Sequence, residues 1–259
     1  MDLGIKGRVA LVCASSQGLG LACATSLARE GADVYINGRD ESRLEHAKSI
    51  ILEKTGVLVN AIQADITKES DRQKLFDHFS IIDILVNNNA GPPPGSMKDW
   101  DHDAWIEAIE CNMLAPILLI RGFINGMRNR KFGRIVNITS AMVKSPRPHM
   151  ALSTTARTGL TAFSKSVSLE SVVDNVTINN LLPERIDTPR QQYMAERLMK
   201  LHAISLEQAR DKITETVAAK RFGLPDEFGD ACAFLCSSQA GFISGQNLQL
   251  DGGSYTGLI

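Results

Sequence analysis

The sequence predicts a single α/β domain with a doubly wound, seven-stranded parallel sheet and helices on both faces. Short runs that are apolar on successive positions alternate with helical stretches along most of the 259 residues. Such runs are typical of strands covered on both faces, and the short links between segments favour β-α-β units. Right-handed crossovers in those units place helices on both sides of the sheet. The chain is also long enough to bury one full core.

Seven segments have the character of strands and six that of helices. The strand-like segments are Val9–Cys13, Asp33–Asn37, Val57–Gln63, Asp83–Asn87, Arg134–Thr139, Val176–Leu181 and Asn247–Leu250. The helical segments are Gly18–Glu30, Glu41–Lys54, Glu69–Phe79, Asp103–Arg130, Leu152–Val173 and Asp226–Ser237. Pro116 interrupts the longest helix, and we expect the helix to bend there.

One further stretch departs from the alternation. Between Thr188 and Phe222 apolar residues recur at helical spacing, as at Met194, Leu198 and Leu201. One or two helices inserted between the sixth and seventh strands would cover the carboxyl ends of the sheet. We therefore interpret residues 188–222 as a substrate lid within one domain of residues 1–259. The alternative is a helical hairpin that is packed there for stability.

The charge balance favours a small-molecule ligand. Lys and Arg number 28, Asp and Glu number 29, and the isoelectric point is near 6.5. A chain with so little net charge has no global field that attracts nucleic acid or an anionic membrane. The N-terminal apolar run is only as long as a strand, and the sequence shows no secretion signal or membrane span. These observations predict a cytoplasmic protein.

The five cysteines favour neither a metal site nor disulfides. They show no Cys-x-x-Cys or zinc-ligand spacing, their number is odd, and they lie in apolar segments. Buried thiols in a reducing compartment explain them more simply, and we expect no metal.

The segment Val9–Glu30 places a strand, a loop of small residues and a helix in immediate succession. Gly18 and Gly20 allow the backbone to approach a ligand closely. The helix that begins there presents unpaired N–H groups and the positive end of its dipole to an anion. The pattern predicts a site for a dinucleotide pyrophosphate. The third small position of the dinucleotide fingerprint falls on Cys23, so an ordinary glycine-rich turn is the alternative.

Five motifs follow one another along the chain. They are the loop Cys13–Gly20, the segment Asp65-Ile-Thr, Asn87–Gly91, Arg134–Ser140 and Gln249–Gly253. Together they resemble the short-chain dehydrogenase/reductase family, and the resemblance spans nearly the whole chain. It implies a Rossmann-type domain. Within the family the sequence looks most like the ketoacyl-reductase-like enzymes, which reduce carbonyls or oxidise alcohols with a nicotinamide cofactor.

The resemblance also implies which residues bind that cofactor. The phosphates would be held by Ser15, Ser16, Gln17, Gly18, Leu19 and Gly20, and the adenine would contact Asp65 and Ile66. The nicotinamide ribose would lie over Asn88, Asn89, Ala90 and Gly91 and be held by Arg157, and the carboxamide would contact Pro183 and Thr188.

Three positions depart from the family pattern. The first loop glycine falls on Ala14, which is tolerable only if its φ stays negative or the backbone shifts slightly. The glycine of the Asn-Asn-Ala-Gly motif falls on Ala90 or Gly91, depending on whether the extra asparagine is counted. Glu184 replaces the glycine of a Pro-Gly pair and brings a carboxylate near the nicotinamide ring or the substrate; we assign no role to it. The departures at the two glycine positions predict weakened cofactor binding.

The end of the second strand predicts NADP(H) rather than NAD(H). A carboxylate there would accept hydrogen bonds from the ribose diol of NAD(H), but the aligned position is Gly38, and Arg39 follows it. A guanidinium can bind a 2′-phosphate through two parallel hydrogen bonds. The alternative is that Arg39 pairs with Asp40 or Glu41 on a solvated turn.

The residues after the fifth strand predict an atypical catalytic site. In the family, a serine is followed thirteen positions later by a tyrosine that supplies a proton, and four further by a lysine that assists it and holds the ribose. From Ser140 this frame reaches Ser153 and then Arg157, so the acid is missing. Ser140 matches the serine that binds the substrate oxygen. Asn112 matches the family asparagine that bends the long helix and orders a water chain.

Loss of the tyrosine predicts a weak catalyst. A serine hydroxyl is a much weaker acid than a phenol, and Arg157 holds its proton too tightly to relay it. A positioned acid contributes about 10²- to 10⁴-fold in rate, so hydride transfer would be slowed but not abolished. A water bound by Ser153, or His149 one turn earlier, could deliver the proton; alternatively, His149 is a surface loop residue. No tyrosine lies near this turn in sequence, since the chain has only Tyr35, Tyr193 and Tyr255.

Functions of different classes fit these residues. The first is an oxidoreductase that transfers a hydride between NADP(H) and a small carbonyl or alcohol, favoured by Asn112 and Ser140. The second is a non-catalytic NADP(H)-binding protein that acts as a sensor or partner subunit, favoured by the departures at Ser153, Arg157, Ala14 and Glu184. A structural partner without nucleotide is a third. Members of the family are usually homotetramers built through the two long helices and the last strand, so we expect a homotetramer.

Overall fold

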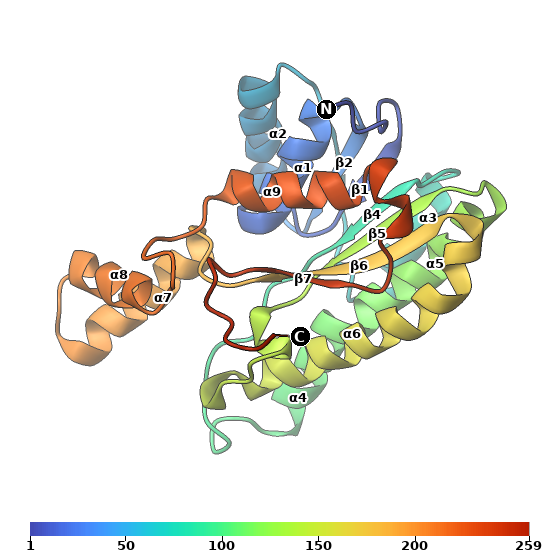
Figure 1. Ribbon diagram of the computed structural model, residues 1–259. Coiled ribbons are helices and arrows are strands. Elements are labelled where there is room, and N and C mark those ends of the chain that lie inside the picture. Colours follow the sequence, from blue (N-terminus) through green and yellow to red (C-terminus); the bar gives the residue numbers. More distant parts are fainter. Residues whose placement is uncertain (259) are drawn as a thin grey trace.

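Seven parallel strands form one sheet in the computed structural model of the protein, which describes residues 1–258 (Figure 1). The strands are β1 (Val9–Val12), β2 (Asp33–Gly38), β3 (Asn60–Gln63), β4 (Ile84–Asn87), β5 (Gly133–Ile138), β6 (Val176–Pro183) and β7 (Asn247–Leu250). Their order is β3-β2-β1-β4-β5-β6-β7, and all neighbouring strands are parallel. This confirms the predicted doubly wound sheet. β3 begins at Asn60 rather than at Val57. Ile259, at the end of the predicted domain, lies outside the described residues.

Helices cover both faces of the sheet. They are α1 (Gly18–Arg29), α2 (Glu41–Thr55), α3 (Glu69–His78), α4 (His102–Ile109), α5 (Ala115–Asn129), α6 (Ala151–Ser171), α7 (Pro189–His202), α8 (Leu206–Glu215) and α9 (Pro225–Leu235). In Figure 1, α1, α2 and α9 lie over one face, and α4, α5 and α6 lie over the other. α7 and α8, which fall in the predicted stretch 188–222, form a hairpin that projects from one end of the sheet. Within residues 1–258, no helix combines the length and the apolar character needed to cross a bilayer.

The predicted helix Asp103–Arg130 is divided. α4 ends at Ile109, and a π-helical turn over Glu110–Leu114 joins it to α5. The residues at the junctions, Ile109, Leu114 and Ala115, keep right-handed helical angles, so the helical backbone continues through this turn. Pro116 has no N–H to bond to the preceding turn, and the irregularity lies in that turn, which contains Asn112.

Side chains along each strand alternate between two hydrophobic clusters, one on each face of the sheet. In β1, Ala10 and Val12 belong to the cluster formed with α1, α2 and α9, whereas Leu11 belongs to the one formed with α3 and α5. All three are fully buried, as predicted for a strand covered on both faces. Four cysteines are buried and Cys111 is half-buried, and all five are free thiols.

A row of asparagines crosses β4, β5, β6 and β7. Asn87, Asn137, Asn180 and Asn247 are paired in register, and the first three are buried. Asn87 Nδ2 donates to Asn137 Oδ1 at 2.8 Å, and Asn137 Nδ2 donates to Asn180 Oδ1 at 3.1 Å. Asn180 Nδ2 then donates to Asn247 Oδ1 at 2.9 Å. Buried amides need such partners, so the row ties the four strands to one register.

The close packing of α1 against α9 at Gly229 gives a first prediction. A Cβ on Gly229 would lie 2.4 Å from Ala22 O and 2.5 Å from Ser26 Oγ. Gly229→Ala must push the helices apart, so we expect the free energy of unfolding to fall by about 1–3 kcal/mol in urea titrations. Gly126→Ala in α5 is the control, because its Cβ would meet only the end of Arg130 at 3.1 Å and alanine favours the helix. Equal effects of the two changes would contradict this account of the packing.

Candidate functional site

A cavity of about 870 Å³ lies at the carboxyl ends of β1, β2, β4, β5 and β6. Ligands of doubly wound sheets bind at this edge, where crossovers leave toward opposite faces. The predicted residues that line the cavity are Ser16, Gln17, Gly18, Leu19, Arg39, Asp65, Ile66, Asn88, Asn89, Ala90, Gly91, Ser140, Ser153, Arg157, Pro183 and Thr188. Ser15, Gly20 and Asn112 are not in its lining.

The loop between β1 and α1 has the features of a phosphate site. Gly18, the first residue of α1, has a φ of +60°, which glycine adopts without strain. The side chain of the N-cap residue Gln17 makes no capping hydrogen bond, so N–H groups of the first turn remain free for an anion. Gly20 has no room for a side chain, because its Cβ would lie 2.6 Å from Ala14 O and 2.8 Å from Asn88 Nδ2. These residues fit a dinucleotide diphosphate.

Ser15 lies differently from the prediction. Its hydroxyl donates to Val12 O at 2.7 Å and accepts a hydrogen bond from Asn37 N at 3.0 Å. Its own N–H donates to Asn37 O. Both of its donors are therefore used within the protein, and the residue is fully buried. This corrects the prediction that Ser15 holds a phosphate: it fixes the loop to the ends of β1 and β2.

Ala14 adopts a left-handed backbone conformation. Its φ is +44°, whereas we expected an alanine here to keep a negative φ or to shift the backbone. This conformation costs a residue with a Cβ about 1 kcal/mol. Asn88 Nδ2 donates to Ala14 O at 3.0 Å, and Ala14 N donates to Asn37 Oδ1 at 3.5 Å. These two amides hold the loop in its strained shape.

Basic residues line the cavity beyond the end of β2. Arg39 and Arg43 are both in the lining, with Asp40 between them. The Asp40 carboxylate accepts hydrogen bonds from Ser42 Oγ at 2.7 Å and Arg43 N at 3.1 Å, and these bonds lower its pKa. Asp40 also forms an ion pair with Arg43 at 3.6 Å. Within residues 1–258 Arg39 has no carboxylate partner, so the predicted alternative of a pair with Asp40 or Glu41 is not found.

Ser140, Ser153 and Arg157 line the same cavity. Ser140 follows β5, and its Oγ accepts a hydrogen bond from Met142 N at 3.2 Å. Ser153 lies in the first turn of α6, one turn before Arg157, whose Nε donates to Ser153 Oγ at 3.2 Å. Each hydroxyl therefore accepts a hydrogen bond from the protein and keeps its own proton for a ligand.

Arg157 is a buried cation. It is only 7% exposed, and its guanidinium donates to Ile138 O at 2.5 Å and to Asn89 O at 3.4 Å. Burial, and to a lesser extent the guanidinium of Arg190, lower the pKa of Arg157 to about 10. The group stays charged near neutral pH. In this desolvated place it can stabilise a negative charge that develops beside it.

Asn112 lies in the π-helical turn, outside the lining of the cavity. Its Nδ2 donates to Ala90 O at 3.3 Å, and Asn89 Nδ2 donates to Cys111 O at 3.1 Å. The two bonds tie the loop after β4 to the turn, so Asn112 positions the loop rather than lining the cavity. Its Oδ1 is buried and accepts no hydrogen bond from the described part of the chain.

Known proteins resemble this chain in sequence and in structure. Residues 13–255 match a family model described as enoyl-(acyl carrier protein) reductase. The NADPH-dependent reductase BacG of Bacillus subtilis (strain 168) is 31% identical over 95% of this chain and 97% of its own. Dehydrogenase/reductase SDR family member 4 of Bos taurus is 31% identical over 98% and 89%. The chain belongs to the short-chain dehydrogenase/reductase family. L-sorbose reductase from Gluconobacter frateurii, solved with NADPH and L-sorbose, matches with a TM-score of 0.93 and 30% identity over 100% of both chains.

In this short-chain dehydrogenase/reductase, α7 adds residues to the cavity that the motifs did not indicate. Arg190, Gln191 and Tyr193 are in the lining. Arg190 Nη2 donates to Pro92 O at 2.9 Å, which joins α7 to the loop after β4. Among the described residues, Tyr193 is the one tyrosine in the lining. Arg190 and Tyr193 are three residues apart and share a helix face, which is the signal that could have found them.

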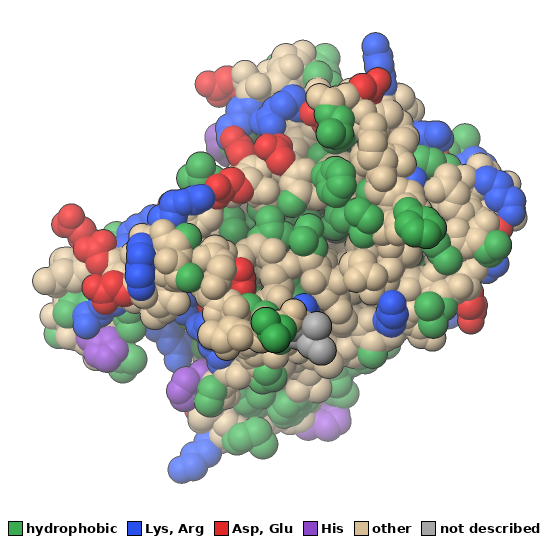
Figure 2. Space-filling view, viewed as in Figure 1, with side chains coloured by type: hydrophobic (Ala, Val, Ile, Leu, Met, Phe, Trp, Pro, Cys, Tyr) green, Lys and Arg blue, Asp and Glu red, His purple; other side chains and the backbone are tan. Residues whose placement is uncertain are grey.

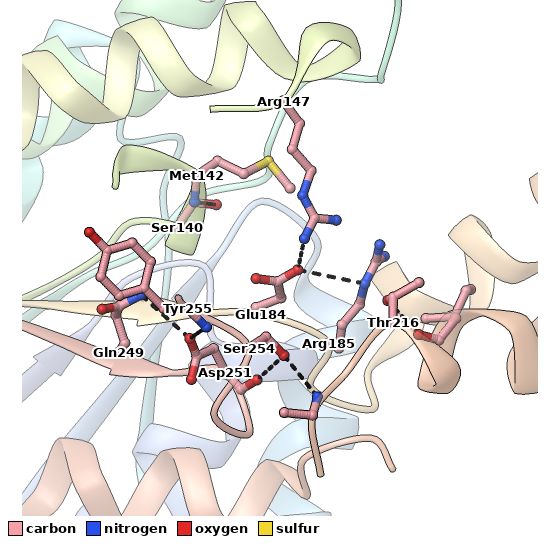
Figure 3. A network of polar contacts seen from close by, with 12 residues as sticks. Ser140, Met142, Arg147, Glu184, Arg185, Thr216, Gln249, Asp251, Ser254 and Tyr255 are labelled. Atoms are coloured by element: carbon pink, nitrogen blue, oxygen red, sulfur yellow. Dashed lines mark hydrogen bonds and ion pairs between the residues drawn. The ribbon is translucent and has the colours of Figure 1, made fainter. Parts of the chain in front are cut away.

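Glu184 has an ion-pair partner. Arg147, from the loop after β5, contacts its carboxylate, and Arg185 Nε lies 4.0 Å from Glu184 Oε1 (Figure 3). The Glu184 side chain is 10% exposed and lines the cavity. His149, near Arg147 in sequence, is exposed and lies outside the lining. The structure therefore supports the surface position for His149 and not proton delivery.

Replacing Ala14 with glycine tests the strain in the phosphate loop. Ala14→Gly removes the Cβ from a left-handed residue, so we expect the free energy of unfolding to rise by about 1 kcal/mol. Thermal or urea unfolding measures the change. Ala22→Gly, inside α1, is the matched control and should lower the free energy of unfolding by a similar amount or more. A destabilised Ala14→Gly protein would show that the loop is not strained.

Proposed function

We propose that this protein transfers a hydride between NADP(H) and a small carbonyl or alcohol substrate without the family's tyrosine acid. The observation that carries the proposal is the position of Ser140, Ser153 and Arg157 in the same cavity as the glycine loop. The relative from Bacillus subtilis is NADPH-dependent, and the sorbose reductase was solved with NADPH. These likenesses support the choice of reaction and cofactor.

The cavity offers contacts along the whole length of NADP(H), which supplies or accepts the hydride when it is bound. The first turn of α1 would bind the diphosphate and Arg39 the 2′-phosphate. Gly38 has no side chain and so leaves room for that phosphate. A Cβ built at this position would lie 3.3 Å from Leu44 Cδ2 and 3.5 Å from Ser16 Oγ. The remaining contacts would come from Asp65, Ile66, Asn88, Asn89, Ala90, Gly91, Arg157, Pro183 and Thr188.

The hydroxyl groups and Arg157 divide the work at the substrate oxygen. Ser140 donates its proton in a hydrogen bond to that oxygen. Arg157 stabilises the negative charge that grows on the oxygen as hydride adds to the carbonyl carbon. Ser153 accepts a hydrogen bond from Arg157 Nε and can donate a hydrogen bond to the water that protonates the oxygen. A serine and a water are weak acids, so we infer slow turnover.

A non-catalytic NADP(H)-binding protein, acting as a sensor or partner subunit, is the second candidate. The observation that favours it is the way Arg157 is held: its guanidinium is bound by Ser153, Ile138 O and Asn89 O, with no phenol beside it. The Glu184 carboxylate on the cavity wall also departs from the family pattern.

We further infer a homotetramer in the cytoplasm whose α7–α8 hairpin covers the substrate. Leu169 of α6 is 69% exposed, Val173, two residues beyond the end of α6, is 79% exposed, and Leu248 of β7 is 40% exposed. Figure 2 shows hydrophobic side chains across the face that carries α9 and β7. Burial against another copy would cover these side chains, and light scattering can test the oligomeric state.

The free thiols favour a reducing compartment. Arg197 Nη1 donates to Pro94 O, a second link between α7 and the loop after β4.

The preference for NADP(H) can be tested at Arg39. Arg39→Leu removes the hydrogen bonds to the 2′-phosphate, so calorimetry should show NADPH binding weakened about 10- to 100-fold. NADH, which lacks that phosphate, should lose little affinity. Arg29→Leu is the control, because Arg29 pairs with Asp230 on α9. An equal loss for both cofactors would contradict the assignment of Arg39.

Turnover separates the oxidoreductase from the non-catalytic protein. NADPH oxidation is followed against ketones, aldehydes and β-ketoacyl thioesters. We expect slow turnover that falls about 10²-fold in Ser140→Ala and does not change in Ser145→Ala, an exposed control. Ser153→Tyr with Arg157→Lys should raise the rate about 10²- to 10⁴-fold. NADPH binding without turnover by either the natural protein or the double variant would reject the oxidoreductase.

A further inference from the structure

Arginine side chains concentrate at the substrate end of the cavity. Arg157, Arg185 and Arg190 line it, and Arg147 contacts the carboxylate of Glu184, which lines the same end. The cofactor phosphates do not account for these arginines, because those would be bound at the first turn of α1 and at Arg39.

The positive charge at this end is only partly compensated. Glu184 pairs with Arg147 and, at 4.0 Å, with Arg185, so one carboxylate faces two guanidinium groups, and in the described chain neither Arg157 nor Arg190 forms an ion pair with a carboxylate. Burial, followed by the charge of Arg147, lowers the pKa of Arg185, and burial lowers that of Arg190. Like charges in a desolvated cavity repel one another, and a bound anion would remove that repulsion.

Arg185 has a strained backbone conformation and N–H donors that make no hydrogen bond within the described chain. Its φ is +56°, a left-handed value that strains a non-glycine residue. Its Nε is buried without a hydrogen bond to the described residues, and its Nη1 lies 3.5 Å from Gln191 Oε1. Arg190 makes one hydrogen bond within residues 1–258, to Pro92 O. A guanidinium carries five N–H donors, so both arginines have donors left for a ligand.

We propose that the substrate carries a carboxylate, which Arg185 and Arg190 bind while its carbonyl or alcohol carbon reacts beside Ser140. This inference rests on the proposed oxidoreductase function and names the substrate class, an oxo acid or the matching hydroxy acid. A single negative charge suits the site better than a phosphate dianion, because Glu184 lies beside Arg185 (Figure 3). A planar carboxylate also matches the two parallel N–H donors of a guanidinium.

The reaction leaves the carboxylate unchanged. In the direction of reduction, the hydride of NADPH forms the new C–H bond at the carbonyl carbon, and a proton from water forms the new O–H bond. The C=O double bond becomes a single bond, the oxo acid is reduced to a hydroxy acid, and NADPH is oxidised to NADP⁺.

The test compares acids with their uncharged esters. NADPH oxidation is measured with 2-oxohexanoate, 3-oxohexanoate and the methyl ester of each, and with dihydroxyacetone phosphate. Esterification changes the reactivity of the ketone, so the readout is the ratio of kcat/KM for acid over ester. We expect Arg190→Gln and Arg185→Gln each to lower this ratio about 10- to 100-fold. Lys200→Gln, which removes an exposed cation of the same helix, should leave the ratio unchanged. The NADPH affinity of each variant reports an intact fold.

The outcomes separate this inference from the proposed function. The inference is overturned if neither Arg190→Gln nor Arg185→Gln changes the ratio. It is also overturned if dihydroxyacetone phosphate is preferred over both oxo acids. If NADPH binds but neither the natural protein nor Ser153→Tyr with Arg157→Lys reduces these compounds or the ketones, aldehydes and β-ketoacyl thioesters, the oxidoreductase proposal fails. Calorimetry with 2-oxohexanoate on the NADP⁺-saturated protein then decides the anion site. Binding that is lost in Arg190→Gln supports it, and absence of binding overturns it.

Discussion

Side-chain amides of asparagine hold the edge of the sheet on which the whole site is built. Backbone groups just beyond the ends of parallel strands have no partner in a neighbouring strand, and a buried amide can supply one. Asn37 Nδ2 donates to Ile62 O and Ala64 O, and Asn88 Nδ2 donates to Ala14 O. The row from Asn87 to Asn247 fixes the other half of the sheet. The glycine loop and the strand ends that carry the cavity residues therefore have set positions before a ligand binds.

Both ends of the cavity are electropositive, for different physical reasons. At the end near β1, free N–H groups and the dipole of α1 provide partial charges on the backbone, with Arg39 beyond them. At the other end, full charges come from Arg157, Arg185 and Arg190 on separate elements. The first end suits the diphosphate of a dinucleotide. The second end carries the full charges of these three arginines, whereas a family member with an uncharged substrate pocket would have none there.

The fold and the positions of Ser140, Ser153 and Arg157 could be predicted from the sequence because both depend on local spacing. Apolar runs fixed the strands to within a few residues, and counting from Ser140 located Ser153 and Arg157, which the structure brings together. The contribution of α7 could not be read in the same way, since Arg190 reaches the cavity only through the fold. The sequence also did not show that the hydroxyl of Ser15 turns inward to Val12 O.

The sequence by itself determined the alternation of elements, the glycine loop at Gly18 and the absence of a tyrosine at position 153, because these are properties of residue type and spacing. Only the tertiary structure decided the left-handed backbone of Ala14, the pairing of Glu184 with Arg147 and the burial of Arg157. Each of these depends on atoms from segments far apart in the chain. Their energies come from desolvation and from contacts that form only when those segments pack together.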